Sequence, residues 1–223
     1  MSEENCLGIN RDTFRQNFNT YTRKAFQTLP SLIKPKVLDI GCGTGVSTLE
    51  IARICNGEIT AIDIDQDSLD IFTKKIEKLG LIHQIQVIMC SIHEMFFKNN
   101  TFDIIWMEGL QFIDFKSRLE ICNPLLKSNG FLVIHDGQEN SEIKIEVVED
   151  NGYNVFSHFD LPNNAWLKEY YEPLEQRILE NKNKFNDDSQ ELMTINKLLN
   201  EINTVKKHPE TARSMFLILQ KIN

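Results

Sequence analysis

The sequence predicts an α/β fold, a three-layer arrangement in which helices cover both faces of a doubly wound, mostly parallel sheet. The first observation is residues 37–45, where a short apolar segment runs directly into a glycine-dense turn. The second is the helical spacing of apolar residues that starts at Val46 and stops at Gly57. The third is another apolar segment, residues 59–64, which contains an acid near its end. A strand, a glycine turn, a helix and a strand in this order begin a nucleotide-binding sheet.

The glycine turn also limits which ligand the sheet can bind. Glycine lets the backbone approach a ligand closely because a Cβ atom would block it, and N–H groups at a helix start favour an anionic group. Dinucleotide sites place a third glycine three residues after the second. Here the glycines are Gly41, Gly43 and Gly45, and the position three after Gly43 is Val46. The spacing therefore disfavours a nicotinamide dinucleotide.

Residues 37–45, with Asp39 just before the turn, resemble the first motif of the class I S-adenosylmethionine-dependent methyltransferases. The resemblance covers about residues 30–160 and the last ten residues. It implies a Rossmann-like sheet of seven strands whose last strand is antiparallel, and S-adenosyl-L-methionine as the cofactor. It also implies that the cofactor is contacted by Asp39, Gly41, Cys42, Gly43 and Gly45.

The acid of the second strand is the expected ribose ligand. Asp63 lies 18 positions after Gly45, close to the offset of about 20 residues known for ribose-binding acids. A carboxylate has two acceptor oxygens, which can receive two neighbouring hydroxyl donors. We expect Asp63 to bind the ribose with Ile64 beside it, and Asp65 to cap the next helix, which ends at Gly80.

The third predicted strand, residues 85–89, leads to the expected adenine site. In the resembled family an acidic residue often stands where this chain has Ser91. A serine hydroxyl can still hydrogen-bond to the adenine, and backbone groups can read the rest of the base. We expect Ile92 to press on the ring, so that Ser91 and Ile92 together bind the adenine.

The fourth predicted strand, residues 102–108, ends at Glu108, beside the expected cofactor and substrate. Enzymes that methylate the exocyclic amines of nucleic-acid bases resemble one another here in a short polar residue, two prolines and an aromatic residue. Those that methylate cytosine carbon carry a Pro-Cys dipeptide. This chain has neither and instead has Trp-x-Glu-Gly at residues 106–109, which resembles small-molecule methyltransferases. We therefore expect Glu108 to contact the cofactor and a small molecule to be the methyl acceptor.

A general base is needed only if the acceptor atom is protonated at the working pH. By placement the candidates are Glu108, Tyr170 and His135, the last in the fifth predicted strand, residues 131–136; no catalytic residue is assigned. Glu108 and Asp136 both end strands and could meet at a magnesium ion, as acids do in catechol-type methyltransferases. Because Gly137 follows Asp136 where that group has asparagine, we expect no metal.

We expect a single domain, residues 1–223, with an N-terminal helical cap, residues 1–30. This segment carries Phe14, Phe18 and Tyr21 on one helical stripe. The stripe either packs on the edge of the sheet or closes as a lid, with Tyr21 over the cofactor. Both interpretations place the segment next to the predicted sheet.

A helical insertion, residues 161–212, separates the sixth predicted strand, residues 153–159, from the last, residues 214–219. Its residues 181–190 are polar and predict a loop between two helices. The insertion is either a lid over the substrate or an oligomer surface that would permit a homodimer. Trp166, Tyr170 and Tyr171 suit a small-molecule pocket and equally suit plain core packing.

The composition excludes several classes of protein. Apolar residues make up 41% and charged ones 25% of 223 residues, and no stretch approaches the roughly 18–20 apolar residues of a membrane span. The net charge of −8 disfavours a nucleic-acid partner. The five cysteines are scattered without C-x-x-C spacing, which indicates reduced thiols rather than a zinc site. The acidic start lacks the features of a signal peptide, so we expect a cytoplasmic protein.

These observations predict methyl transfer from S-adenosyl-L-methionine to a small-molecule acceptor by in-line displacement. One alternative is a non-catalytic regulatory protein that binds S-adenosylmethionine, because cofactor contacts alone do not establish turnover. A less favoured alternative is an NAD-dependent oxidoreductase, which would use a similar strand–turn–helix unit.

Overall fold

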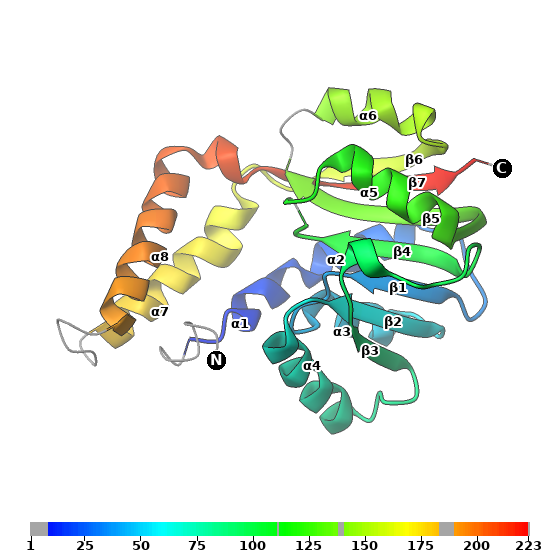
Figure 1. Cartoon of the computed structure of the whole chain (residues 1–223). Coiled ribbons are helices and arrows are strands. Elements are labelled where there is room, and N and C mark those ends of the chain that lie inside the picture. The colour runs from blue at the N-terminus through cyan, green and yellow to red at the C-terminus, as the bar shows by residue number, and fades with distance from the viewer. Residues whose placement is uncertain (1–8, 111, 138–140, 183–189, 223) are drawn as a thin grey trace. The chain divides into compact units, whose positions relative to one another are not determined.

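The computed structural model describes residues 9–110, 112–137, 141–182 and 190–222, and the chain divides into two compact units. The larger, here called the sheet unit, consists of Asn19–Asp160 and Ser214–Asn223. The smaller, the helical unit, consists of Met1–Phe18 and Leu161–Arg213. Figure 1 labels the elements of both. All the residues predicted to contact the cofactor belong to the sheet unit.

The sheet unit contains seven strands among its described residues, in the order β3-β2-β1-β4-β5-β7-β6. Strand β7 is antiparallel to both of its neighbours, whereas the pairs from β3 to β5 are parallel. The predicted seven-stranded sheet with an antiparallel last strand is confirmed. The strands are β1 Lys36–Ile40, β2 Glu58–Asp63, β3 Ile85–Met89, β4 Phe102–Glu108, β5 Leu126–Gly137, β6 Tyr153–Asp160 and β7 Ser214–Lys221.

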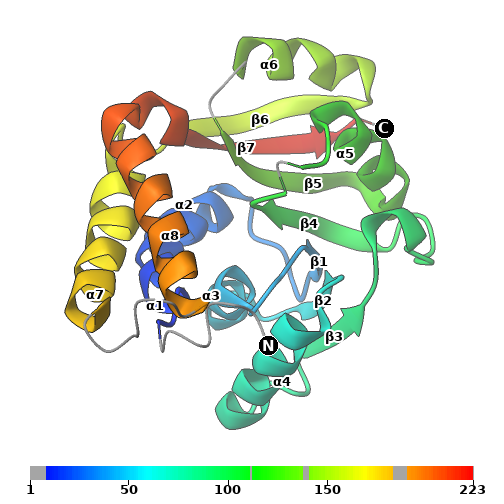
Figure 2. The same cartoon turned by 60° about the vertical axis from the view of Figure 1, so that its left-hand side comes forward.

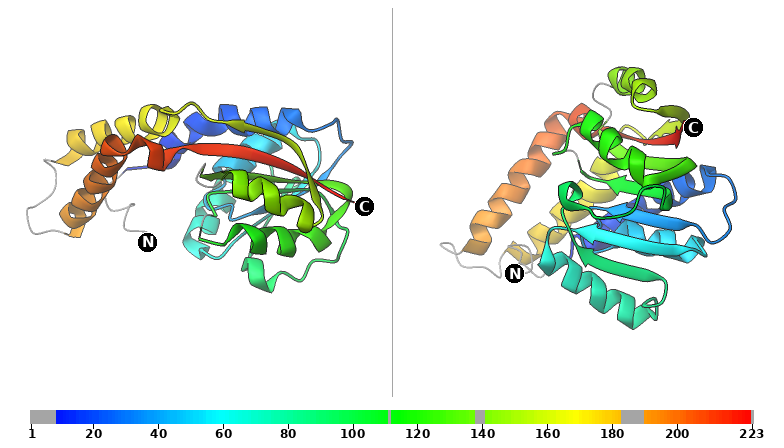
Figure 3. Two further views of the ribbon diagram at one scale, coloured as in Figure 1. Left: turned by 90° about the horizontal axis from the view of Figure 1, so that it is seen from above. Right: turned by 45° about the vertical axis from the view of Figure 1, so that its right-hand side comes forward.

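Helices cover both faces of this sheet, with α2 and α3 on one face and α5 and α6 on the other (Figure 3). The strand order reverses direction between β1 and β4, and ligands of open α/β sheets bind outside the carboxyl ends of the strands at such a point. The helices of the sheet unit are α2 Asn19–Thr28, α3 Val46–Ile54, α4 Gln66–Leu79, α5 Phe115–Cys122 and α6 Ser141–Asp150, with short 3-10 turns η3 Ile92–Glu94 and η4 Asn123–Leu125.

The central strands form the core of the sheet unit. Four consecutive residues of β4 are at most 1% exposed, including Trp106 and Met107, whose side chains point to opposite faces. A strand buried on both faces reads as a continuous apolar run, as the sequence of β4 does. This buried centre holds the carboxyl ends of β1 and β4 in fixed positions, which is where the candidate site lies.

Helix α2 belongs to the sheet unit because a buried acid anchors it to α3. The Glu50 side chain is 1% exposed and forms an ion pair of 2.6 Å with Arg23 of α2. On the same helix, the ring of Phe26 lies 6.2 Å from that of Trp106. The predicted aromatic stripe of the N-terminal segment is therefore divided between the units: Tyr21 lies on α2, whereas Phe14 and Phe18 belong to the helical unit.

Within the helical unit, aromatic contacts join the N-terminal segment to the insertion. Phe18 packs against Trp166 at a ring distance of 4.5 Å, and Phe14 meets Tyr170 edge-on at 6.3 Å. The two long helices of this unit, α7 and α8, lie antiparallel and side by side in Figure 2. An ion pair of 2.5 Å between Lys206 of α8 and Glu175 of α7 joins them. The elements are α1 Asp12–Arg15, η2 Gln16–Phe18, the π-helix η5 Trp166–Tyr171, α7 Glu172–Lys182, α8 Gln190–Lys207 and η6 Pro209–Ala212.

The insertion is thus helical, as its spacing predicts, and the loop predicted at residues 181–190 falls largely outside the described residues. Its role as a lid or an oligomer surface stays a prediction, as does the homodimer. Of the helices that the structure describes, none combines the length and apolarity that a membrane crossing requires. The cytoplasmic location stays a prediction.

Candidate cofactor site

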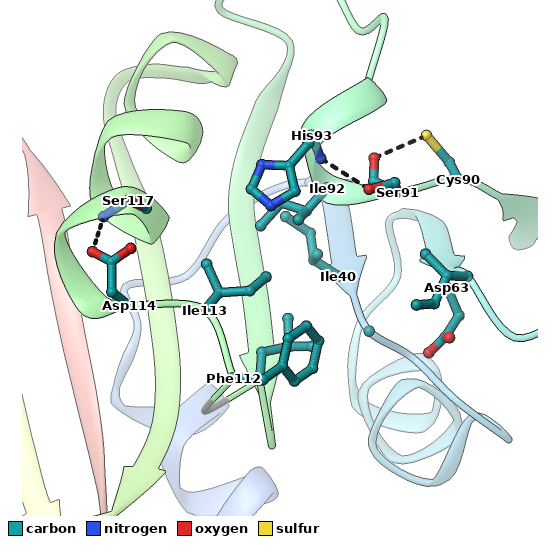
Figure 4. Close-up of a pocket in the computed structure, with 13 residues that line it drawn as sticks. Ile40, Asp63, Cys90, Ser91, Ile92, His93, Phe112, Ile113, Asp114 and Ser117 are labelled. Atoms are coloured by element: carbon teal, nitrogen blue, oxygen red, sulfur yellow. Dashed lines mark hydrogen bonds between the residues drawn. The ribbon is translucent and has the colours of Figure 1, made fainter.

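A cavity of about 560 Å³ opens at the carboxyl ends of β1 and β2 and the segments that follow β3 and β4. Its volume is within the range usual for small-molecule sites. In Figure 4, Asp63 lies across the cavity from Ile113 and Asp114. Thirteen residues line it: Ile40, Gly41, Asp63, Ile64, Cys90, Ser91, Ile92, His93, Leu110, Phe112, Ile113, Asp114 and Ser117.

The glycine turn beside this cavity contains two kinds of glycine. All three have left-handed backbone conformations, with φ of 75° at Gly41, 50° at Gly43 and 81° at Gly45. At Gly41 an added Cβ atom would lie 2.5 Å from a methyl carbon of Leu110, and at Gly45 it would lie 2.1 Å from the ring of Phe72. At Gly43 an added Cβ atom would have no atom within 4 Å. Packing therefore requires Gly41 and Gly45, whereas Gly43 leaves open space in which a ligand can approach the backbone.

Asp63 connects the end of β2 to the glycine turn. One carboxylate oxygen accepts the Gly43 N–H at 2.7 Å, and the other accepts the Asp65 N–H at 2.9 Å. Each oxygen keeps a second lone pair, so the carboxylate can still accept two hydroxyl protons from the cavity. Asp65 instead caps α4 by accepting the Asp67 N–H, as predicted. The predicted cap at Asp65 is confirmed, and Asp63 lines the cavity, where its binding of the ribose stays a prediction.

The far end of the cavity contains the residues predicted to bind adenine. The Ser91 hydroxyl accepts the His93 N–H at 3.3 Å and so caps the turn η3, while Ile92 is buried. Ile64 is 65% exposed at the cavity, which leaves its side chain available to a planar ligand.

The opposite wall is made by the segment after β4, which the sequence analysis did not assign to the site. Phe112 is 75% exposed, whereas Ile113 and Leu110 are buried. Asp114 begins α5, where its carboxylate accepts the Ser117 N–H at 2.9 Å. The only sequence signal for this wall is an apolar pair next to a helix cap, and that signal is too common to identify a site.

Two predicted cofactor residues are buried beneath the turn. Asp39 is 1% exposed, and its carboxylate accepts the Thr48 hydroxyl proton at 2.5 Å. Burial, partly offset by the Thr48 hydrogen bond and reinforced by the charges of Glu108 and Asp63, raises the pKa of Asp39 from 3.8 to about 7. Burial likewise raises the pKa of the Cys42 thiol well above its usual value, so this thiol remains protonated and inert.

Glu108 ends β4 within a polar network that crosses to the neighbouring strand. One of its oxygens accepts the Thr22 hydroxyl proton at 2.9 Å and the Trp106 indole N–H at 2.8 Å. Its other oxygen lies 3.5 Å from Nδ1 of His135, and Nε2 of His135 lies 2.9 Å from the Ser214 hydroxyl. The structure thus brings together two of the three base candidates, Glu108 and His135, on adjacent strands.

Glu108 and Asp136 do not approach a common ion in the way the magnesium hypothesis requires. Glu108 pairs in register with His135, and the next residue, Asp136, turns to the opposite face of β5. There its carboxylate accepts a hydrogen bond from the buried Arg118 at 2.7 Å. Over the described ranges, no group of three His, Cys, Asp or Glu side chains could hold a metal ion.

The third base candidate, Tyr170, belongs to the helical unit. Its hydroxyl receives a hydrogen bond from Arg11, and its ring packs edge-on against Trp166. Burial raises the pKa of the Tyr170 phenol, which Arg11 only partly offsets, so the phenol keeps its proton at neutral pH. Tyr21, predicted to cover the cofactor, is half-buried on α2 in the sheet unit and stays a prediction in that role.

Comparison with known proteins identifies the family. Residues 37–130, from β1 into β5, match the family model described as Methyltransferase domain. This segment is a class I S-adenosylmethionine-dependent methyltransferase domain. The matched residues contain the glycine turn, Asp63, Ser91 and Glu108, so membership rests on the same segment that forms the cavity.

The relatives of this methyltransferase are similar over part of their length. The ubiquinone/menaquinone biosynthesis C-methyltransferase UbiE of Psychromonas ingrahamii is 31% identical over 103 residues, which are 44% of this chain and 41% of the relative. In eight of the curated relatives, the matched segments span between 19% and 51% of the relative's length.

Solved structures share the fold of the methyltransferase at low sequence identity. Phosphoethanolamine N-methyltransferase 2 of Haemonchus contortus, in complex with S-adenosyl-L-methionine, has a TM-score of 0.72 at 18% identity, over 93% of this chain and 53% of that one. The 4+2 cyclase SpnF has a TM-score of 0.78 at 16% identity, over 92% of this chain and 81% of that one. These likenesses support the fold, and the second shows that one fold serves more than one reaction.

The cavity contains five of the predicted cofactor residues of this methyltransferase: Gly41, Asp63, Ile64, Ser91 and Ile92. Four other predicted residues lie in or next to the glycine turn but do not line the cavity: Asp39, Cys42, Gly43 and Gly45. Glu108 and Tyr21 lie outside the residues that line this cavity. The cofactor role of each residue stays a prediction.

Proposed function

We propose that this methyltransferase transfers a methyl group from S-adenosyl-L-methionine to a small-molecule acceptor by in-line displacement. The observation that supports it most directly is the position of Asp63. This carboxylate faces a cavity of about 560 Å³ while it accepts a hydrogen bond from Gly43, the glycine of the turn that leaves open space beside the backbone. A carboxylate that can accept two hydroxyl protons, next to a backbone that a ligand can approach, suits the ribose of a nucleoside cofactor.

The residues that line the cavity suit the ribose and the adenine of this cofactor. Asp63 would accept the ribose hydroxyls, and Ile92, Ile64 and Phe112 would offer apolar surface to the adenine. Glu108, an acid at the carboxyl end of β4, would favour the cationic end of the molecule. When bound, S-adenosylmethionine supplies an electrophilic methyl group on a sulfonium, so the main task of the protein is to orient the acceptor in line with it.

The network around Glu108 is the best candidate for handling a proton. Thr22 and Trp106 donate to one oxygen of Glu108, which fixes the carboxylate and leaves its second oxygen toward His135. An acceptor that loses a proton during methyl transfer would need such a fixed base, whereas an acceptor with a free lone pair would not.

A small-molecule acceptor is supported by the names of the relatives. UbiE of Psychromonas ingrahamii is named for quinone biosynthesis, and the Haemonchus contortus enzyme is named for phosphoethanolamine. The sequence also lacks the strings by which base-methylating enzymes resemble one another at the end of the fourth strand. We propose a small organic acceptor and assign no further identity to it.

Two assays test the proposal. Calorimetry should show that the protein binds S-adenosylhomocysteine and does not bind NAD; the reverse would reject the assignment. Incubation with S-adenosylmethionine and a panel of small amines, phenols and carbon acids should then release S-adenosylhomocysteine. Binding without release from any acceptor would favour the alternative of a non-catalytic, S-adenosylmethionine-binding regulator.

A further inference from the structure

We propose that Lys75 is a positioning residue for the cofactor: a helix side chain that touches no ligand and sets the shape of the glycine turn. The Lys75 ammonium donates a hydrogen bond to the carbonyl oxygen of Thr44 at 2.7 Å, across 31 positions of sequence. Thr44 lies between the two glycines, Gly43 and Gly45, whose conformations decide whether a nucleoside can approach. The inference rests on the proposed function and adds a determinant of cofactor affinity to it.

Three side chains contact the glycine turn, one from the end of β2 and two from α4. The Asp63 carboxylate accepts the Gly43 N–H at 2.7 Å. The Phe72 ring fills the space in which a side chain at Gly45 would stand, 2.1 Å from an added Cβ. Lys75, one helical turn after Phe72 on the same face of α4, holds the carbonyl between these two points.

The N–H groups of Gly41, Cys42, Gly43 and Gly45 are already engaged, and Lys75 acts on the turn through a carbonyl oxygen. Gly41 and Cys42 donate to the Ile62 carbonyl at 2.8 and 3.0 Å, and Gly45 donates to the Cys42 carbonyl at 2.9 Å. These bonds fix both ends of the turn. Lys75 orients the peptide between Thr44 and Gly45 at its oxygen, and a rotation of that peptide would change ψ at Thr44 and φ at Gly45.

The bond is stronger than an ordinary surface contact because its donor is charged and partly buried. Lys74, the preceding residue, is exposed on the same helix and carries the same charge. It therefore provides a matched control in which one lysine is removed without touching the turn. Both substitutions change the net charge of the protein by the same amount.

The test compares Lys75→Met, Lys74→Met and Lys75→Arg by calorimetry with S-adenosylhomocysteine. We expect Lys75→Met to raise the Kd about tenfold, as loss of a bond from a charged donor implies. Lys74→Met should stay within about twofold of the unaltered protein, and Lys75→Arg should recover most of the loss. Equal Kd values for Lys75→Met and Lys74→Met would overturn the proposal.

A second readout needs no ligand. Amide hydrogen exchange of Gly45, whose N–H is bonded within the turn, should be faster in Lys75→Met than in Lys74→Met, while exchange in β4 remains unchanged in both. Unchanged exchange at Gly45 would contradict the positioning role. If the unaltered protein binds no S-adenosylhomocysteine, the proposed function fails, and the exchange measurement alone decides whether Lys75 shapes the turn.

Discussion

The two kinds of glycine in the turn predict that alanine affects folding and cofactor binding differently at Gly43 and at Gly45. Gly43→Ala places a methyl group in open space, and its folding cost is the left-handed backbone conformation alone, about 1–2 kcal/mol. Gly45→Ala carries the same backbone cost and also drives a methyl group to 2.1 Å from the Phe72 ring. Overpacking of this kind adds about 1–3 kcal/mol, so the total loss is about 2–5 kcal/mol.

Gly43→Ala, the substitution with the smaller cost in folding, should have the larger effect on the affinity for the cofactor. At Gly43 the new methyl group would occupy the space that we assign to the cofactor, so the affinity for S-adenosylhomocysteine should fall at least about tenfold although the protein remains folded. Urea unfolding measures the first effect and calorimetry the second. If Gly43→Ala binds S-adenosylhomocysteine as the unaltered protein does, or if it is destabilised as much as Gly45→Ala, the division into packing and ligand glycines is wrong.

Two further predictions concern buried charges. Because burial raises the pKa of Asp39 to about 7, its stabilising contribution is present below pH 4 and is lost as the pH rises through 7. The free energy of unfolding should therefore fall between pH 4 and 8 by up to about 4 kcal/mol more in the unaltered protein than in Asp39→Asn, and parallel urea titrations of the two would contradict this. Arg23→Met should destabilise the protein by about 1–3 kcal/mol, since it removes the 2.6 Å partner of a carboxylate, Glu50, that is 1% exposed. Arg53→Met, which removes the more exposed and more distant partner of Glu50, should cost less than about 1 kcal/mol, and the reverse order would refute the anchoring of α2.

The features that could be predicted from the sequence are those encoded within a single strand–turn–helix segment. Asp63 in the cavity and Asp65 as a helix cap follow from their positions relative to the end of β2, and the structure has both. The fifth strand was predicted too short, as residues 131–136. It begins at Leu126 because that residue pairs with Phe102, before an irregularity in the register of β4 and β5.

The features that could not be predicted depend on partners far apart in the chain. Glu108 is fixed by Thr22, 86 positions earlier, and His135 meets Ser214, 79 positions later. Both hydroxyl residues are buried, yet nothing in the sequence beside them distinguishes them from serines and threonines of the surface. The separation of Glu108 from Asp136 follows from the strand register, which places His135, and not Asp136, opposite Glu108.

The most direct test is a crystal structure of the protein with S-adenosylhomocysteine. We expect the ribose hydroxyls to lie within hydrogen-bond distance of the Asp63 carboxylate, with the backbone of Gly43 against the ligand and the adenine between Ile92 and Phe112. A ligand bound elsewhere, or an Asp63 side chain turned away from the sugar, would contradict it.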